Sequence, residues 1–460
     1  MLALFGLFAT AFAVVIPPLQ LNDEHGHFVR AYLISRGEFI GHPDSQLPAP
    51  VMAFVRRYPE WSFKPDPRVS FRELAAELTA RDVSGSNNNS EPVRDDAEHR
   101  YLQWAVRGAN IYCPIVYLPA SLGILAARVL RFTPLAMMYM ARIANVLFVL
   151  LALWIAFQVS RSFPALIAAV ALMPMTLHQT GGISGDAVTI AVSILGFALV
   201  FRTREEKVDR RYLLVLLIFF AVWGLCKASI WALPFILLVS PSQFSSKRRY
   251  LVYLAAGACG VVMTLAVWQM MNHANLEELR IARLARGIDM SANTRMIIRH
   301  PLAVLRNILD LIQLNMNTYI AQFIGAFGWA KFRLPLVLRI PYLLLLIFVA
   351  ATERLCKPLG IYERVILLGG FLLAVLTIHV VIFFSDATCA GDQAGVATRC
   401  FEASAGIQGR YFIPFCLAGL LALNQQWFNF SSQRLMRLVA GVASFTALIS
   451  LWMISLFYYA

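Results

Sequence analysis

Long apolar runs recur from one end of this 460-residue chain to the other, with short polar segments between them. Residues 135–159, 250–271 and 365–385 are clear examples, and the runs at 163–177, 187–201, 229–239, 411–424 and 438–459 are also expected to form helical spans. A helix that crosses a lipid bilayer needs about 20 consecutive apolar residues. Hydrophobic residues make up 59% of the chain and charged residues 14%, whereas a soluble domain averages about 25% charged residues. The sequence therefore predicts an all-α integral membrane protein with many spans.

Basic residues are concentrated in the short segments between the apolar runs. The net charge is +14, and lysines and arginines cluster at 202–211, 245–249, 353–364 and 431–437. Short loops rich in lysine and arginine stay on the cytoplasmic side of a membrane. With these clusters inside, the chain is predicted to have about eleven transmembrane helices. Neither zinc-finger spacing nor a basic-aromatic groove occurs, so nucleic acid is not an expected partner.

The polar segments divide the chain into five parts. They are a first transmembrane helix (1–18), an external loop with interfacial helices (19–133), transmembrane helices of a catalytic module (134–271), a second external helical segment (272–333), and C-terminal transmembrane helices (334–460) with an external loop at 386–409. A cleaved signal peptide is the alternative for the first part, although basic residues are missing from its start.

The first external loop contains three segments with patterns of their own. Residues 71–80 have helical periodicity and are expected to form an interfacial helix, and SGSNNNS at 84–90 is typical of a flexible tip. Residues 111–130 are apolar but interrupted by Pro114 and Pro119. We expect this segment to lie at the membrane surface, because the later basic loops then fall on one side.

Two cysteines lie close together in the predicted external loop near the C-terminus. Ten residues separate Cys389 from Cys400. In an oxidising compartment such a pair favours a disulfide, Cys389–Cys400. Two free thiols are the alternative. The spacing of the other cysteines does not suggest a zinc site.

The strongest candidate for chemistry follows the first apolar run directly. Asp23 and Glu24 are adjacent acids, and His25 and His27 come next. Asp23 and His27 are four residues apart, so they share one face of a helix. Such a group could hold a divalent cation such as Mg²⁺ or Mn²⁺, or supply a general base. The alternative is an N-cap, with Asn22 or Asp23 capping a helix that starts at Glu24.

Three further span ends on the same predicted face carry charged groups. Asp186 opens an apolar helix after a glycine-rich turn, where an acid is also favourable for purely electrostatic reasons. Lys227 interrupts an apolar hairpin, and Arg410 and Tyr411 open a later span. Both cations suit a phosphate group. The alternatives are a lysine that extends to the membrane surface and an interfacial Arg-Tyr anchor.

These segments resemble a bacterial family of polytopic membrane proteins of unknown function that is related to the GT-C glycosyltransferases. The shared motifs are DEHGH (23–27), PMTLHQTGGISGDAVT (174–189), FIGAFGWAKFRLP (323–335) and QGRYFIP (408–414), in that order. The likeness covers most of the chain, and QGRYFIP is its most specific element.

The GT-C resemblance implies roles for particular residues. Enzymes of this type place an acid in the first external loop, where Asp23 and Glu24 stand, and a second acid two spans later, where Asp186 stands. Many carry a lysine in a turn between two spans. Lys227 is similar, although Ala228 and Ser229 replace the usual glycine and proline. By this resemblance Asp23 or Glu24 is the general base, and Asp186 is a second catalytic acid.

The remaining site residues follow from the same resemblance. Lys227 and Arg410 would bind the phosphate of the substrate, while His27 and Tyr411 would position the acceptor. If a metal ion takes part, Asp23, Asp186 and His27 are its expected ligands.

The resemblance thus implies an inverting glycosyltransferase in the bacterial inner membrane, with its active site facing the periplasm. It would move a sugar from a polyprenyl-phosphate donor, whose tail stays among the membrane lipids, to a hydroxyl of a glycan, lipid or protein acceptor. Nucleotide sites are not needed, and no Walker or Rossmann fingerprint occurs. The alternatives are a transporter or flippase of lipid-linked saccharides, a glycan polymerase or ligase, and a membrane scaffold. Acids at external span ends favour a transferase, whereas acids at the midplane favour transport.

Overall fold

The computed structural model describes residues 1–42, 45–58, 68–79, 106–328, 330–389, 400–401, 406–425 and 430–459. The predicted flexible tip at 84–90 lies outside these residues, as do all ten residues between Cys389 and Cys400.

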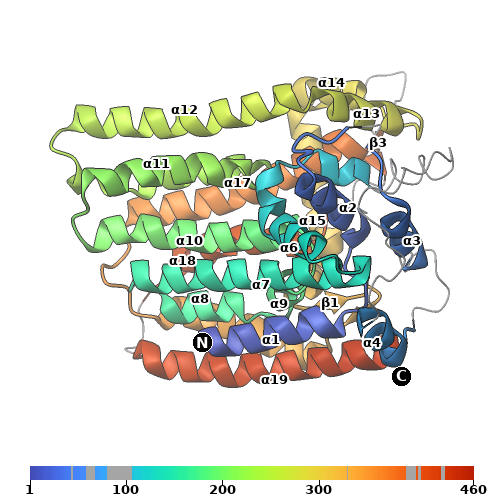
Figure 1. Ribbon diagram of the computed structural model, residues 1–460. Coiled ribbons are helices and arrows are strands. Elements are labelled where there is room, and N and C mark those ends of the chain that lie inside the picture. Colours follow the sequence, from blue (N-terminus) through green and yellow to red (C-terminus); the bar gives the residue numbers. More distant parts are fainter. Residues whose placement is uncertain are drawn as a thin grey trace.

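Long apolar helices run side by side through the molecule (Figure 1). Among the described residues, five helices are long and apolar enough to cross a membrane. They are α7 (Pro134–Val159), α10 (Gly185–Glu205), α12 (Lys247–Met271), α17 (Ile361–Asp386) and α19 (Ser432–Tyr459). Each coincides with a predicted span, which confirms the all-α membrane class; the total number of spans stays a prediction.

Other helices complete the bundle. They are α1 (Leu2–Val15), α6 (Leu118–Val129), α8 (Pro164–Ala171), α9 (Pro174–Thr180), α11 (Arg210–Leu225), α15 (Pro301–Ile324), α16 (Leu336–Thr352) and α18 (Cys416–Ala422). Short 3-10 helices adjoin them: η2 (Pro114–Tyr117), η3 (Cys226–Ala228), η4 (Ile230–Leu238), η5 (Pro241–Gln243) and η6 (Gly409–Phe415).

One end of the bundle is covered by short helices, and we call it the capped end. These are α2 (Glu24–Ser35), α3 (Ala49–Arg57), α4 (Phe71–Thr79), α13 (His273–Leu284) and α14 (Met290–Arg299), which gather on the right in Figure 1. They come from the two segments predicted to be external, and α4 confirms the helix expected at 71–80. Segments 19–58 and 272–299 therefore lie over the same end of the long helices.

The loops that carry the basic clusters meet at the opposite end, which we call the basic end (160–162, 203–211, 240–249 and 353–364). The backbone N–H of Arg161 donates to Glu205, and Arg204 pairs with Glu363 at 3.1 Å. The Glu353 carboxylate accepts the backbone N–H groups of Ala165 and Leu166, which open α8. The sequence analysis placed these basic loops and the predicted site residues on opposite sides, and in the structure they lie at opposite ends of the bundle.

Prolines break three of the predicted spans. Residues 163–177 were expected to form one helix, but α8 ends at Ala171 and α9 begins at Pro174. The expected helix at 229–239 is the 3-10 helix η4 around Pro234, and the span at 411–424 begins as η6 around Pro414. Proline lacks an N–H and its ring collides with the preceding turn, so a continuous α-helix cannot form there.

Two short antiparallel hairpins accompany the helices. Strand β1 (Ala326–Phe327) pairs with β2 (Phe332–Arg333). Strand β3 (Thr388–Cys389) pairs with β4 (Cys400–Phe401), and the backbone register sets Cys389 directly opposite Cys400. The disulfide between these cysteines stays a prediction.

Helix α6 packs along α7 at a position that only glycine can occupy. A Cβ at Gly123 would collide with the Met140 carbonyl and would lie 2.9 Å from the Cα of Ala141. Both obstacles are backbone atoms, so neither can rotate away.

We predict that Gly123→Ala lowers the free energy of unfolding by about 1–3 kcal/mol, because the two helices must move apart. Thermal unfolding of the protein in detergent measures this loss. Gly260→Ala on α12 is the matched control, since a Cβ there meets nothing within 4 Å. Equal thermal stability of Gly123→Ala and wild type would show that the close approach of α6 and α7 is not needed.

Candidate functional site

A buried ion pair fixes the start of α2 against the rest of the bundle. Both Glu24 and Arg142 have fully buried side chains, and two guanidinium nitrogens of Arg142 donate to the Glu24 carboxylate at 2.9 and 2.7 Å. Arg142 also donates to the carbonyls of Ala13, Ile16 and Pro17, at the end of α1. One arginine on α7 therefore holds both sides of the turn between α1 and α2.

The glycine-rich turn before α10 packs against the same pair. The backbone N–H of Ile183 donates to Glu24 at 2.9 Å, and Asn145 on α7 donates to the Gly182 carbonyl at 2.9 Å. A Cβ at Gly182 would collide with Leu21, and one at Gly181 would lie 2.8 Å from the Ala13 backbone nitrogen. The glycines of the TGGISGD segment thus allow this turn to approach α1, which sets Asp186 beside Asp23.

Asp23 directs its carboxylate away from the helix that it precedes. It is the residue before α2, it has a left-handed backbone (φ 62°), and its side chain makes no capping hydrogen bond. The side chain is 51% exposed, and Oδ2 lies 3.0 Å from Nη2 of Arg410. A positive φ in a non-glycine residue is uncommon and is often found where function needs it. The Asp23 carboxylate therefore does not cap α2, which was the alternative reading of this residue.

Asp186 connects the two predicted phosphate-binding cations. Its Oδ1 accepts from Nζ of Lys227 at 2.5 Å, and its Oδ2 lies 3.5 Å from Nε of Arg410. Lys227 has φ 51° at the break between α11 and η4, so it shares the left-handed conformation of Asp23. The two acids and two cations form one charge-balanced group, in which Arg410 touches both carboxylates.

Arg410 has hydrogen-bonding capacity that its neighbours do not use. Its side chain is 4% exposed, yet within the described part of the chain Nε and Nη1 make no hydrogen bond. Buried donors are nearly always paired in folded proteins, with protein or with bound molecules. Nε already faces Asp186 at 3.5 Å, so Nη1 is the donor that a ligand anion can reach without displacing a carboxylate.

The QGRYFIP segment is anchored from two sides. The backbone N–H of Gly409 donates to Gln322 on α15 at 2.8 Å, and Asn22 donates to Gln408 at 3.2 Å. A Cβ at Gly409 would collide with the Tyr319 carbonyl, so only glycine lets η6 lie this close to α15. Arg410 is therefore positioned by α15 and by the residues just before Asp23.

His27 and several aromatic rings lie next to the four charged side chains. Nδ1 of His27 lies 2.7 Å from the Tyr117 hydroxyl. The Lys227 ammonium lies 5.1 Å from the ring centre of Tyr112 and 5.5 Å from that of Tyr411, within cation-π range. Burial and the Lys227 ammonium lower the pKa of His27 to about 4. His27 is therefore neutral near pH 7 and serves as a hydrogen-bonding group there.

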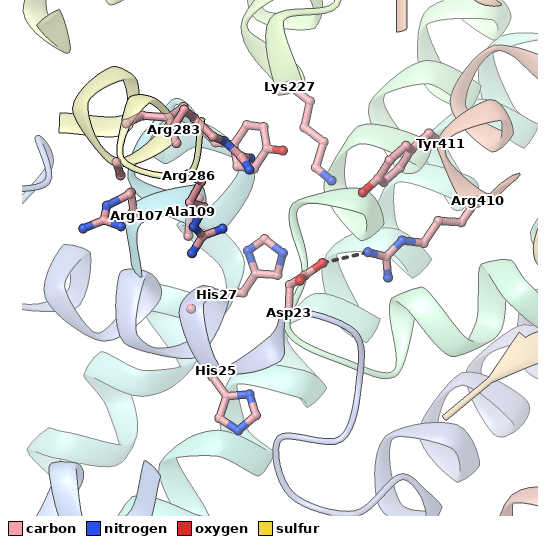
Figure 2. Close-up of a pocket in the computed structure, with 15 residues that line it drawn as sticks. Asp23, His25, His27, Arg107, Ala109, Lys227, Arg283, Arg286, Arg410 and Tyr411 are labelled. Atoms are coloured by element: carbon pink, nitrogen blue, oxygen red, sulfur yellow. Dashed lines mark hydrogen bonds and ion pairs between the residues drawn. The ribbon is translucent and has the colours of Figure 1, made fainter. Parts of the chain in front are cut away.

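These residues border a cavity of about 300 Å³ at the capped end. Figure 2 shows Asp23 and His27 in its middle, with Lys227, Arg410 and Tyr411 on one side and Arg107, Arg283 and Arg286 on the other. The three arginines come from the helical residues 106–110, from the end of α13 and from the turn that follows it. The sequence gave no specific signal for them beyond their place in the predicted external segments.

The acids are not arranged to hold a metal ion. Among the residues that the structure describes, no three His, Cys, Asp or Glu side chains come close enough together to bind one. Asp23 is paired with Arg410, and Asp186 is paired with Lys227 and Arg410. Carboxylates that already face cations are poor ligands for Mg²⁺ or Mn²⁺. The expected set of Asp23, Asp186 and His27 does not fit a divalent cation, and we derive no step through one.

Six of the seven predicted site residues come together, and Glu24 is separate. Asp23, His27, Lys227, Arg410 and Tyr411 line the cavity, and Asp186 lies directly behind the cations. Glu24 does not line it, because its carboxylate is fully occupied by Arg142 and by backbone N–H groups. Of the two adjacent acids, Asp23 therefore presents its carboxylate to the cavity, and Glu24 holds α1, α7 and the turn before α10 together.

We predict that Glu24→Gln or Arg142→Met lowers the free energy of unfolding by about 3–5 kcal/mol, because each leaves one buried charge unpaired. Thermal unfolding in detergent measures the effect. Arg202→Gln is the control, since the Arg202–Glu206 pair is largely exposed and such pairs contribute about 1 kcal/mol or less. If Glu24→Gln is no more damaging than Arg202→Gln, the buried pair does not hold this part of the fold.

A pH dependence follows from His27. Its pKa is about 4 in the folded protein and about 6.5 in an unfolded chain. Between these values only the unfolded state takes up the proton, so stability falls as the pH drops from about 6.5 to about 4. His27→Asn keeps a hydrogen-bonding group towards Tyr117 and cannot take up that proton. We predict that its melting temperature falls less over this range than that of wild type; parallel curves would contradict a neutral His27.

Comparison with known proteins supports the membrane class. Residues 5–418 match the model of a family described as "Predicted membrane protein (DUF2142)". The search of curated proteins and that of solved structures returned no match. The family match covers most of the chain and all of the pocket residues named above. The chain is a multi-pass membrane protein and belongs to the DUF2142 family of predicted membrane proteins.

Proposed function

We propose that this protein is a GT-C-type glycosyltransferase that moves a sugar from a polyprenyl-phosphate donor to an acceptor hydroxyl. The observation that carries the proposal is the group of Asp23, Asp186, Lys227 and Arg410 at one end of an apolar bundle, beside a cavity. A lipid-phosphate substrate needs an apolar path for its tail and cations at the membrane surface for its head. The apolar helices of the bundle, with Lys227 and Arg410 at the capped end, support this assignment.

The donor phosphate binds between Lys227 and Arg410. The ammonium group supplies a point charge, and the guanidinium supplies the Nη1 donor, which makes no hydrogen bond within the described chain. Asp186 keeps both cations in place before the substrate arrives. Preorganised cations of this kind stabilise the negative charge that develops on a departing phosphate.

Asp23 is the general base, and phosphate binding releases it. In the free protein its carboxylate is engaged by Arg410. A phosphate at Arg410 competes for the same guanidinium, so Asp23 becomes free to accept a proton. Its half-exposed side chain borders the cavity, where an acceptor can reach it.

The reaction is one displacement at the anomeric carbon. The acceptor hydroxyl gives its proton to Asp23, and its oxygen forms a bond to the anomeric carbon. The bond from that carbon to the phosphate oxygen breaks, and polyprenyl phosphate leaves with the electron pair. Attack opposite the leaving group inverts the configuration. His27 and Tyr411 position the acceptor as neutral hydrogen-bonding groups, and Asp186 acts on the cations.

The orientation follows from the charge of the loops. Basic clusters lie at the end opposite the cavity, and short basic loops stay in the cytoplasm. We therefore infer a bacterial inner-membrane protein whose pocket faces the periplasm, with a role in modifying glycans or lipids of the cell envelope.

A flippase of lipid-linked saccharides is the main alternative. A flippase needs a polar path between both membrane surfaces, and transporters often carry charged groups near the midplane. Here the paired charges Asp23, Asp186, Lys227 and Arg410 lie together at the capped end, which favours a transferase. A glycan polymerase or ligase shares the chemistry and differs only in its acceptor.

We predict that Asp23→Asn abolishes glycan modification. A strain without the gene is complemented with wild type or with the variant, and its surface glycans and lipids are analysed by mass spectrometry. Loss of a general base lowers the rate by about 10²–10⁴-fold. Asparagine also tolerates the left-handed backbone, so the fold is kept. Asp310→Asn on α15, an exposed acid away from the cavity, should behave as wild type.

Two results would contradict the proposal at different levels. Normal product from the Asp23→Asn strain, with the variant present in the membrane, would remove Asp23 as the base. A deletion strain whose surface glycans and lipids are all unchanged would remove the transferase function itself.

A further inference from the structure

The cavity has a second basic wall that the proposed donor site does not use. Arg107, Arg283 and Arg286 line it on the side away from Lys227 and Arg410, with Asp23 and His27 between the two groups (Figure 2). Arg283 lies in the last turn of α13, Arg286 lies in the turn that follows it, and Arg107 comes from the helical residues 106–110. We call these three residues the arginine wall.

The two sides of the cavity differ in how their cations are paired with carboxylates. Lys227 and Arg410 are balanced by Asp186 and Asp23. On the wall, Arg107 pairs with Glu278 at 3.2 Å and Arg283 pairs with Asp386 at 2.5 Å. Arg286 makes no ion pair within the part of the chain that the structure describes. Among the residues that the structure describes, the lining arginine without an ion pair is therefore Arg286, on this wall.

Stabilisation of the C-terminal end of α13 does not explain why the three arginines meet at the cavity. Cations near a helix C-terminus interact favourably with its dipole, which suits Arg283 and Arg286. Arg280 is one turn earlier on α13, and it pairs with Glu277 instead and does not line the cavity. Three arginines from two separate segments converge on the cavity, and convergence across segments is not needed to stabilise one helix.

The position of the wall indicates which substrate it serves. A donor diphosphate would hold its two phosphates side by side, so both would lie next to Lys227 and Arg410. As seen from Arg410, the arginine wall lies beyond Asp23 (Figure 2). If Asp23 takes the proton of the acceptor, the space beyond it belongs to the acceptor.

We propose that the arginine wall binds an anionic group of the acceptor, a phosphate or a carboxylate next to the hydroxyl that receives the sugar. This assignment rests on the proposed function, because it places the donor at Lys227 and Arg410. The acceptor is thus an acidic glycan or a phosphorylated lipid headgroup rather than a neutral sugar.

Binding measurements on the purified full-length protein in detergent test this proposal without requiring turnover. The acceptor probes are glucose 6-phosphate, glucuronic acid and neutral glucose, and farnesyl phosphate is the probe for the donor phosphate. We expect wild type to bind at least one acidic sugar more tightly than glucose. Arg283→Gln/Arg286→Gln should weaken that binding roughly tenfold or more, since hydrogen bonds to charged groups are lost. Preference for glucose 6-phosphate identifies a phosphate, and preference for glucuronic acid a carboxylate.

Two variants separate this proposal from the proposed function. Arg280→Gln is the matched control on the same helix and should bind every probe as wild type does. Farnesyl phosphate should bind the wall variant normally and should lose roughly tenfold in affinity with Arg410→Gln. Failure of farnesyl phosphate to bind would count against the donor site, even if the acidic sugars still depend on the wall.

The proposal is overturned by either of two results. One is that acidic sugars bind no better than glucose, or bind the wall variant as well as wild type. The other is that the wall variant loses farnesyl phosphate and keeps the acidic sugars, which would assign the arginines to the donor. Because the wall is partly exposed, its anion binding should also weaken as salt is raised.

Discussion

The buried pair of Glu24 and Arg142 is the interaction on which the rest of the site depends. Arg142 holds the carbonyls at the end of α1, and Glu24 receives the backbone of the glycine turn before α10. Three chain segments that are distant in sequence are thus joined around two side chains. A buried charge pair is tolerated only when both partners are fully satisfied. The turn containing Asp23 therefore has little freedom, and its left-handed conformation is a consequence of that anchoring.

Charge balance explains how these four ionised side chains can lie at the end of an apolar bundle without a bound ligand. Asp23, Asp186, Lys227 and Arg410 compensate each other, so the apolar bundle does not carry an isolated charge. The exposed member is Asp23, and the buried members are Asp186 and Arg410. An incoming phosphate can therefore replace the exposed carboxylate while the buried framework remains. In our account the same exchange holds the donor and frees the base.

Much of the fold followed from the sequence because lipid imposes simple rules. Apolar length identified α7, α10, α12, α17 and α19, and the basic loops that the sequence grouped on one side do meet at one end of the bundle. Continuous spans were wrongly expected at Pro174, Pro234 and Pro414, where the effect of a proline on the helix was overlooked.

The candidate site was only partly visible in the sequence. The sequence placed the span ends that carry Asp23, Asp186, Lys227 and Arg410 on the same side of the membrane. That prediction was enough to group these four residues. Adjacency could not separate Asp23 from Glu24, because the partner that distinguishes them, Arg142, is 118 residues away from Glu24. The arginine wall was missed for a similar reason: its members become a group only when α13 folds over the cavity.

The most direct test of the central claim is an experimental structure of the full-length protein with farnesyl phosphate. Our account predicts that the phosphate lies within hydrogen-bonding distance of Lys227 Nζ and Arg410 Nη1, and that the Asp23 carboxylate has left Arg410 and faces the cavity. A phosphate bound elsewhere, or an Asp23–Arg410 pair still intact beside the bound phosphate, would contradict the exchange on which the proposed mechanism rests.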